Sequence, residues 1–350
     1  MSDQFEDPGL SPNYERRLAM RANVAEFEPE QVARAVEVLT GAKVSVTPTF
    51  IPRGLDNENW MVDTAAGRLL VKIGAHEAPV AKWRAAAVAR VLAARAGVPV
   101  PRLVASHEQL PALDGRHVRI FAALEGYTLH DPAGPGQAPP QVWTELGAAV
   151  HRLHSIRLDA FTSRLDGSAP AFATWDAYLA YRIPQIDGRA RACAWLDDLD
   201  LDPLWDALHA AAWRLAPVIR PGLTHRDLHV DNILISPSGG LAAILDWDQA
   251  EAWDPVADLV KLRWLLFEEV PGSEAAFIEG YGSPAAVHPH LEERLDIAGV
   301  VELVNTIAGH LPHEAVAVRR LRARLQAVTA SAGWPAVPRS RTGGPPGASE

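Results

Sequence analysis

The sequence predicts an α+β fold with two lobes, an N-terminal lobe built on an antiparallel sheet and a larger, mainly helical C-terminal lobe. Short strand-like runs separated by turn residues occupy much of residues 44–124, a pattern typical of a meandering sheet. Segments with apolar residues at helical spacing then recur to residue 330. The chain has 350 residues, of which 48% are hydrophobic, so it can bury a substantial core.

The N-terminal lobe is predicted to span residues 29–122. Its first helix begins at Pro29 and ends at Gly41, with apolar residues at helical spacing between them. Strands and a second helix follow, separated by turns. We expect the strands at residues 44–51, 59–64, 68–74, 98–106 and 117–124, and the helix at residues 81–97. These elements predict a small sheet with a helix across it.

The C-terminal lobe is predicted to span residues 123–335 and begins with a loop rich in Pro and Gly. Val142 and Leu146 lie on one face of its first helix. The segments LTHRDLHVDNILIS and LAAILDWDQA, joined by a Gly-Gly turn, interrupt the helical pattern and predict a loop and a β-hairpin. Residues 1–28 are expected to be flexible, and residues 336–350, rich in Pro, Gly and Ser, to be disordered.

The composition argues against several classes of function. A formal net charge of −10 disfavours binding to nucleic acid through its phosphates. The chain has no long apolar run, and its N-terminus lacks the basic start and apolar stretch of a secretion signal. We therefore expect a cytoplasmic protein that does not enter a membrane. Cys193 is the only cysteine, which excludes an intramolecular disulfide and a cysteine-based zinc cluster. The sequence does not indicate the oligomeric state.

Three polar residues on the predicted hairpin carry the chemistry. Asp227 and Asn232 lie in a turn-like loop, and Asp246 ends the next apolar strand. Pairing of the two strands brings Asn232 and Asp246 side by side. Mg²⁺ prefers oxygen ligands, often one or two carboxylates together with substrate phosphates, so this pair predicts a magnesium site. Asp227 then remains free to accept a proton.

These segments resemble the aminoglycoside phosphotransferase and choline kinase branch of the kinases. HRDLHVDN has the HxDxxxxN spacing, and ILDWDQAEAWDPVADL is similar to that branch's Asp-Trp-Asp segment with its later Asp-Pro and Asp-Leu. The resemblance covers roughly residues 50–260. It implies a protein kinase-like fold and transfer of the γ-phosphate of ATP, with GTP left open, to a small-molecule hydroxyl. It makes Asp227 the catalytic base, Asn232 and Asp246 the ligands of Mg²⁺, and His225 a residue that shapes the loop.

The same resemblance places the nucleotide on the N-terminal lobe. GLDNENWMV is similar to the family's nucleotide loop and supplies Gly54 and Asn57, and the next strand supplies Lys72 for the α- and β-phosphates. Backbone groups from Ala122 to Leu124 are expected to meet the adenine. The sequence departs from the family in one respect, because the helix at residues 81–97 contains no glutamate to hold the lysine. Only Glu77 lies nearby.

The acceptor is the least determined part of this interpretation. A polyamine such as an aminoglycoside is the first expectation, because acidic residues of the second lobe are available to face it. They are Asp248, Glu251, Glu268, Glu269, Glu293 and Glu302. Solvated helix faces explain most of these charges equally well. The alternatives are a less charged antibiotic with a sugar hydroxyl, a metabolite such as choline or a sugar, and a non-catalytic pseudokinase that only binds nucleotide.

Overall fold

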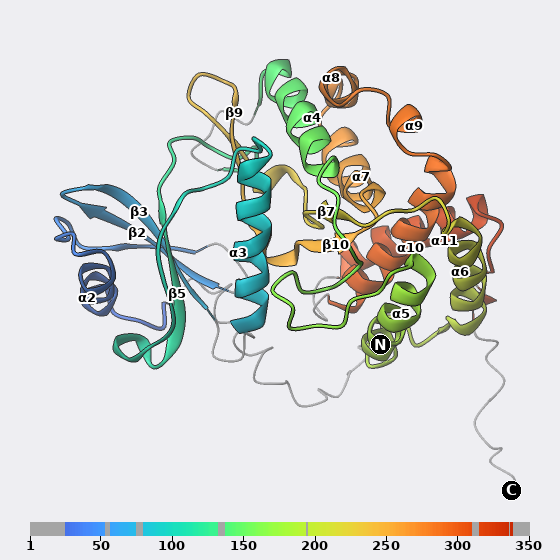
Figure 1. Ribbon diagram of the computed structural model, residues 1–350, viewed down its shortest axis with the longest axis horizontal. Helices are drawn as coiled ribbons and strands as arrows, with labels where there is room; N and C mark the ends of the chain where they lie inside the picture. Colours follow the sequence, from blue (N-terminus) through green and yellow to red (C-terminus); the bar gives the residue numbers. More distant parts are fainter. Residues whose placement is uncertain are drawn as a thin grey trace, which may run out of the picture.

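The computed structural model describes residues 25–52, 57–74, 80–131, 137–193, 195–309, 315–335 and 337–338. It has the two lobes that the sequence predicts, a sheet lobe and a helical lobe, with helix α3 standing between them (Figure 1). The predicted flexible N-terminal segment and disordered tail lie largely outside the described residues. Residues 25–28 are described, and there the amide of Phe27 donates to the buried carboxylate of Glu58 at 3.3 Å.

The N-terminal lobe contains one antiparallel sheet of five strands in the order β1-β2-β3-β5-β4. The predicted helix from Pro29 forms as α2, and Gly41 ends it with a left-handed backbone, φ 71°. The second predicted helix forms as α3. The bounds are α2 Pro29–Thr40, β1 Thr49–Ile51, β2 Asn57–Thr64, β3 Gly67–Gly74, α3 Val80–Arg95, β4 Leu103–Leu110, η1 Pro111–Leu113 and β5 Arg116–Ala122.

The C-terminal lobe is helical around a few short strands. The predicted hairpin forms from β8 and β9, which pair antiparallel. A second antiparallel pair, β7 with β10, was not predicted. The bounds are α4 Pro140–His154, α5 Trp175–Arg191, β6 Leu199–Asp200, α6 Asp202–Leu215, β7 Gly222–Thr224, η2 Val230–Asn232, β8 Ile233–Ile235, β9 Leu241–Ile244, η3 Trp247–Gln249, β10 Glu251–Trp253, α7 Val256–Leu262, η4 Arg263–Phe267, α8 Ser273–Tyr281, α9 Pro284–Val287, α10 Leu291–Ala308, α11 Ala315–Ser331 and β11 Val337–Pro338.

Each lobe has its own apolar core. The N-terminal core lies between α2 and the sheet and includes Val36, Trp60 and Ile120. The larger core fills the helical lobe. There α4 and α8 approach so closely that a side chain at Gly147 would overlap the backbone of α8. Among the described residues, no helix combines the length and the apolar character needed to cross a membrane.

Candidate active site

One buried carboxylate holds the backbone of the loop that follows β7. Asp258, at the start of α7, accepts the backbone N–H groups of His225 at 2.8 Å and of Arg226 at 2.6 Å. His154 of α4 lies 3.2 Å from the same carboxylate. Arg226 has φ 66°, a left-handed conformation that side chains rarely adopt and that persists where surrounding contacts hold it. This turn places Asp227, the next residue, at the surface of the loop.

His225 joins this loop to the hairpin. Its Nε2 lies 2.7 Å from the carbonyl of Leu245, and its Nδ1 accepts the backbone N–H of Asp227 at 3.2 Å. The ring is fully buried, and burial lowers its pKa, so the imidazole is held in its neutral form. A neutral ring can donate from Nε2 and accept at Nδ1 at once. These contacts match the loop-shaping role expected for His225.

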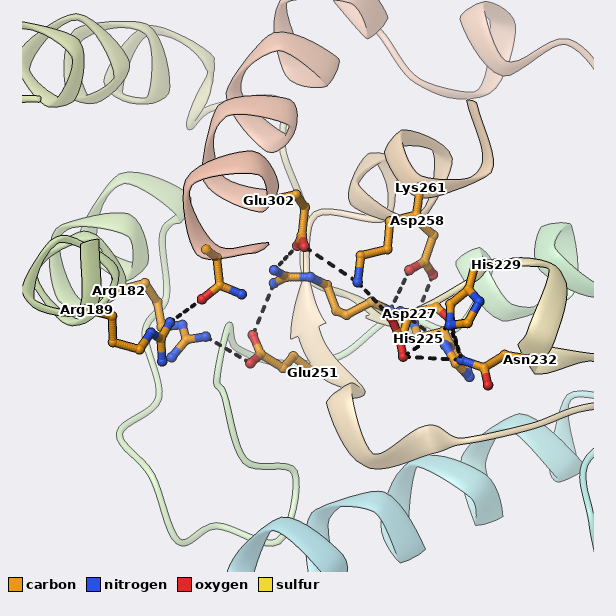
Figure 2. A network of polar contacts seen from close by, with 12 residues as sticks. Arg182, Arg189, His225, Asp227, His229, Asn232, Glu251, Asp258, Lys261 and Glu302 are labelled. Carbon is orange, nitrogen blue, oxygen red and sulfur yellow. Dashed lines mark hydrogen bonds and ion pairs between the residues drawn. The ribbon is translucent and has the colours of Figure 1, made fainter. Parts of the chain in front are cut away.

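The carboxylate of Asp227 is held on both oxygens (Figure 2). Lys261 of α7 donates to Oδ1 at 2.7 Å, and Asn232 donates to Oδ2 at 3.2 Å. The Asp227 side chain keeps 28% of its surface exposed, so an acceptor hydroxyl can still reach it. Burial alone would raise the pKa of Asp227, but Lys261 and His229 outweigh it and hold the pKa well below its usual value. The group is therefore an anion able to accept a hydrogen bond.

Asn232 and Asp246 stand at the same end of the β8–β9 hairpin. Ile233 pairs with Ile244, and the N–H of Leu245 donates to the carbonyl of Asn232 at 2.8 Å. Asp246 has φ 54°, and its buried Oδ1 accepts no hydrogen bond. The amide nitrogen of Asn232 is directed to Asp227, which leaves the amide oxygen available. A carboxylate oxygen that accepts no hydrogen bond and an amide oxygen at the same end of the hairpin fit a hard cation such as Mg²⁺.

Lys72 of β3 extends toward the other lobe. Its Nζ lies 3.5 Å from Oδ1 of Asp246. Helix α3 contains no acidic residue, as the sequence showed, and the carboxylate beside this lysine comes from the end of the hairpin in the helical lobe. Gly54 and Glu77 lie outside the described residues. The lysine thus reaches the predicted magnesium ligand without a helix glutamate.

The remaining residues expected at the nucleotide lie at the start of β2 and at or just after the end of β5. Asn57 is 7% exposed, and its amide nitrogen lies 3.4 Å from a carboxylate oxygen of Asp248. Ala122 is the last residue of β5, and the N–H of Ala123 donates to the carbonyl of Arg68 at 3.0 Å. Leu124 follows with 42% of its surface exposed. The adenine contact expected of Ala122 to Leu124 stays a prediction.

Asp248 lies in a buried ion pair between the lobes. Arg119 of β5 donates to its two oxygens at 2.6 and 2.7 Å, a bidentate geometry that strengthens the pair. The guanidinium also lies over the ring of Trp83, 3.7 Å from its centroid. Burial alone would raise the pKa of Asp248, but Arg119 outweighs it and the pKa is lowered. Because the carboxylate is paired and 8% exposed, it presents no free charge to an acceptor.

The other acidic residues expected to face a polyamine are also paired. Glu251 is 6% exposed and accepts from Arg182 at 3.1 Å, and Glu302 is 3% exposed and pairs with Arg226 and Lys261. The three remaining carboxylates lie nearer the surface. Glu268 pairs with Arg324 at 2.6 Å, Glu293 with Arg214 at 2.9 Å, and Glu269 lies 3.4 Å from His130. The buried members of this set therefore support a charge network and not an open acidic pocket.

Sequence reasoning missed two residues of the site, Lys261 and Arg119. Lysine is rare in this chain, and Lys261 is one of only four, which is the one signal that singles it out. Arg119 gives no local signal. Its position follows from the sheet register, in which Lys72 pairs with Arg119, so both side chains lie on one face.

Comparisons with known proteins identify the family and the fold of the chain. Residues 47–294 match the model of a family described as the phosphotransferase enzyme family. A comparison with curated proteins finds no match. The fold resembles a Haemophilus somnus protein described as a fructosamine-3-kinase, with a TM-score of 0.63 and 15% identity over 85% of this chain and 97% of the other.

Two aminoglycoside-type enzymes have the same fold. Spectinomycin phosphotransferase APH(9)-Ia, solved with ADP and spectinomycin, gives a TM-score of 0.53 and 16% identity over 88% of this chain and 93% of the other. A thermostable mutant of APH(4)-Ia, solved with AMP-PNP and hygromycin B, gives a TM-score of 0.61 and 17% identity over 86% of this chain and 98% of the other. The similarity confirms the predicted two-lobed, kinase-like fold. Since the family model spans most of the chain, this protein belongs to the phosphotransferase enzyme family.

Proposed function

We propose that this protein transfers the γ-phosphate of ATP to a hydroxyl group of a small molecule. The observation that carries the proposal is the arrangement of Asp227, Asn232 and Asp246, in which an ionised, partly exposed carboxylate lies beside an amide and a second carboxylate that can bind a cation. Phosphoryl transfer depends mainly on positioning and on charge neutralisation, which this arrangement can provide. ADP and AMP-PNP occupy two structures of the same fold, which supports ATP as the donor.

Each residue has a proposed task. Asp227 accepts a hydrogen bond from the acceptor hydroxyl, orients its oxygen and takes its proton as the bond to phosphorus forms. Lys72 adds positive charge for the phosphates. Asn232 and Asp246 would hold Mg²⁺, which when bound neutralises phosphate charge. Asn57, Ala122, Leu124 and the loop at Gly54 are proposed to contact the nucleotide.

The proposed acceptor is an aminoglycoside or another hydroxylated antibiotic, as in the spectinomycin and hygromycin B complexes of the two similar enzymes. A metabolite such as an amino-sugar adduct, choline or a sugar is the second candidate, favoured by the similarity to the protein described as a fructosamine-3-kinase. The paired state of Asp248, Glu251 and Glu302 removes one argument for a polycationic acceptor. The acceptor panel must therefore include neutral sugars as well as polyamines.

The test is ATP consumption by the purified chain with and without panels of antibiotics and metabolites. An acceptor-dependent rate is expected, and Asp227→Asn should lower kcat by about 100- to 10,000-fold. Asp246→Asn should weaken nucleotide binding in the presence of Mg²⁺ while leaving the fold intact. Thermal stabilisation by ATP without turnover on any acceptor would support the pseudokinase alternative. Full activity of Asp227→Asn would refute the proposed role of that residue.

A further inference from the structure

A buried cation beside the catalytic carboxylate has no assigned role. Lys261 lies on α7 and reaches back to the loop after β7, where its Nζ is 2.7 Å from Oδ1 of Asp227. Its side chain is 18% exposed. A lysine buried without a partner would lose its charge, so this contact and a second carboxylate keep it protonated. The pKa of Lys261 is raised, because the Coulombic pull of Asp227 and Glu302 outweighs burial.

The second carboxylate belongs to Glu302 of α10, which lies 4.0 Å from Lys261 and also pairs with Arg226. Arg226 in turn contacts Glu251 at 3.3 Å and lies over the ring of Trp253, 4.0 Å from its centroid. Figure 2 shows Lys261 between Asp227 and Glu302. Arg226 then links Glu302 to Glu251. The buried carboxylate of Glu302 thus holds the ammonium group of Lys261 on the side away from Asp227.

The two partners of Asp227 hold different oxygens. Asn232 comes from the loop itself and donates to Oδ2, whereas Lys261 comes from α7 and donates to Oδ1. A carboxylate held on both oxygens cannot rotate freely about its last bond. The loop residue His229 approaches the oxygen that Asn232 holds, with its Nε2 3.7 Å from Oδ2.

We infer that Lys261 is a positioning residue, which holds the carboxylate of Asp227 in the orientation that receives the acceptor hydroxyl. The inference rests on the proposed function, because it acts through the proposed base. Loss of Lys261 would leave the carboxylate of Asp227 held on Oδ2 alone, by Asn232. A misplaced reacting group commonly costs about 100-fold in rate, so the effect should fall on kcat.

Kinetics of five variants test the role. Lys261→Met should lower kcat by about 10- to 100-fold with little change in KM for ATP, and Lys261→Arg should restore most of the rate because it keeps the charge. In the Asp227→Asn background, Lys261→Met should cause no further loss, since residues that act as a unit are not additive. Lys43→Met is the control. Lys43 has an 84% exposed side chain outside the site, and its loss should leave kcat unchanged.

A second measurement works without any acceptor. Reductive methylation followed by mass spectrometry resolves the four lysines of the chain. Lys261 should be protected in the parent and labelled several-fold faster in Asp227→Asn, because the loss of one carboxylate lowers the pKa of the amine. Lys43 should label equally in both. If Lys261→Met fails to fold, this measurement still tests the contact with Asp227 that the positioning role requires.

The outcomes separate the two claims. Unchanged labelling of Lys261 in Asp227→Asn, or a parent-like kcat in Lys261→Met, would overturn the positioning role. A further loss in the double variant would also overturn it, because Lys261 would then act independently of Asp227. Protection of Lys261 in a chain that phosphorylates no acceptor would refute the proposed function and leave the ion pair established.

Discussion

The ion pair between Arg119 and Asp248 makes a quantitative test of how the lobes are joined. The two side chains are 5% and 7% exposed and share two hydrogen bonds of 2.6 and 2.7 Å. Arg119→Met keeps most of the volume but removes the charge, and so leaves Asp248 buried without its main partner. Breaking a buried pair in this way costs about 3–5 kcal/mol. We expect that loss in the free energy of unfolding of Arg119→Met.

The assay is denaturant unfolding followed by circular dichroism and by tryptophan fluorescence. The two probes must give coincident transitions before a single free energy is derived, because a chain with two lobes need not unfold in one step. Asp248→Asn should lose a similar amount, and the double variant should lose clearly less than the sum, since neither charge is then left alone. The KM for ATP should also rise in Arg119→Met. Asp248, the partner of Arg119, lies in η3, which directly follows the proposed magnesium ligand Asp246, so a shift of η3 would displace that ligand.

The sheet offers a matched control. Arg68 and Asp63 form a pair of similar geometry on β2 and β3, at 2.7 and 3.3 Å, but their side chains are 62% and 39% exposed. Exposed pairs contribute about 0–1 kcal/mol, so Arg68→Met should be nearly neutral. If Arg119→Met were as mild as Arg68→Met, or if the double variant lost the full sum, the reasoning from burial would be refuted.

Two further predictions concern packing and pH. Gly147→Ala should lower the melting temperature strongly, because its new Cβ would lie 2.1 Å from the carbonyl oxygen of Phe277. Gly188→Ala on α5 is the control and should be neutral or stabilising, because nothing lies within 4 Å of the added Cβ. Equal melting temperatures of the two variants would contradict the close approach of α4 and α8. Burial, aided by nearby cations, lowers the pKa of His288 from 6.5 to about 3. The neutral imidazole therefore contributes fully to the stability of the folded protein above pH 6.5, and this contribution is lost as the pH falls toward 3. His288→Gln should therefore make the acid-side fall in melting temperature shallower, and parallel curves for parent and variant would exclude this cause.

Much of the fold follows from local sequence signals. Helices α2 and α4 and the β8–β9 hairpin were predicted because apolar periodicity and turn residues are read within a few positions. The β7–β10 pair was not predicted, since each strand has three residues and the partners Thr224 and Glu251 lie far apart in the sequence. A strand that short has no periodicity of its own, and no direct turn joins β7 to β10 as the Gly-Gly turn joins β8 to β9.

The candidate site divides in the same way. Asp227 and Asn232 lie five positions apart, so one short motif in the sequence contains both. In the structure, Nδ2 of Asn232 lies 3.2 Å from Oδ2 of Asp227. Lys261 is 34 positions from Asp227, and Arg119 is 129 positions from Asp248. No local pattern encodes such a pair. The acidic residues assigned to a polyamine illustrate the same limit, because a sequence shows how many charges a segment has but not which cation each one meets.

The absent helix glutamate shows how distant residues alter the meaning of a local departure. In the sequence, helix α3 lacks the charge that would hold Lys72, and this departure was the main support for the pseudokinase alternative. In the structure, Lys72 and its neighbour in the sheet, Arg119, both meet carboxylates of the helical lobe, Asp246 and Asp248. Separation of the lobes would break both pairs, and one of them is buried. The negative charge beside Lys72 therefore comes from the other lobe, and it is present as long as the two lobes stay in contact. The lack of a glutamate on α3 is then no argument against catalysis.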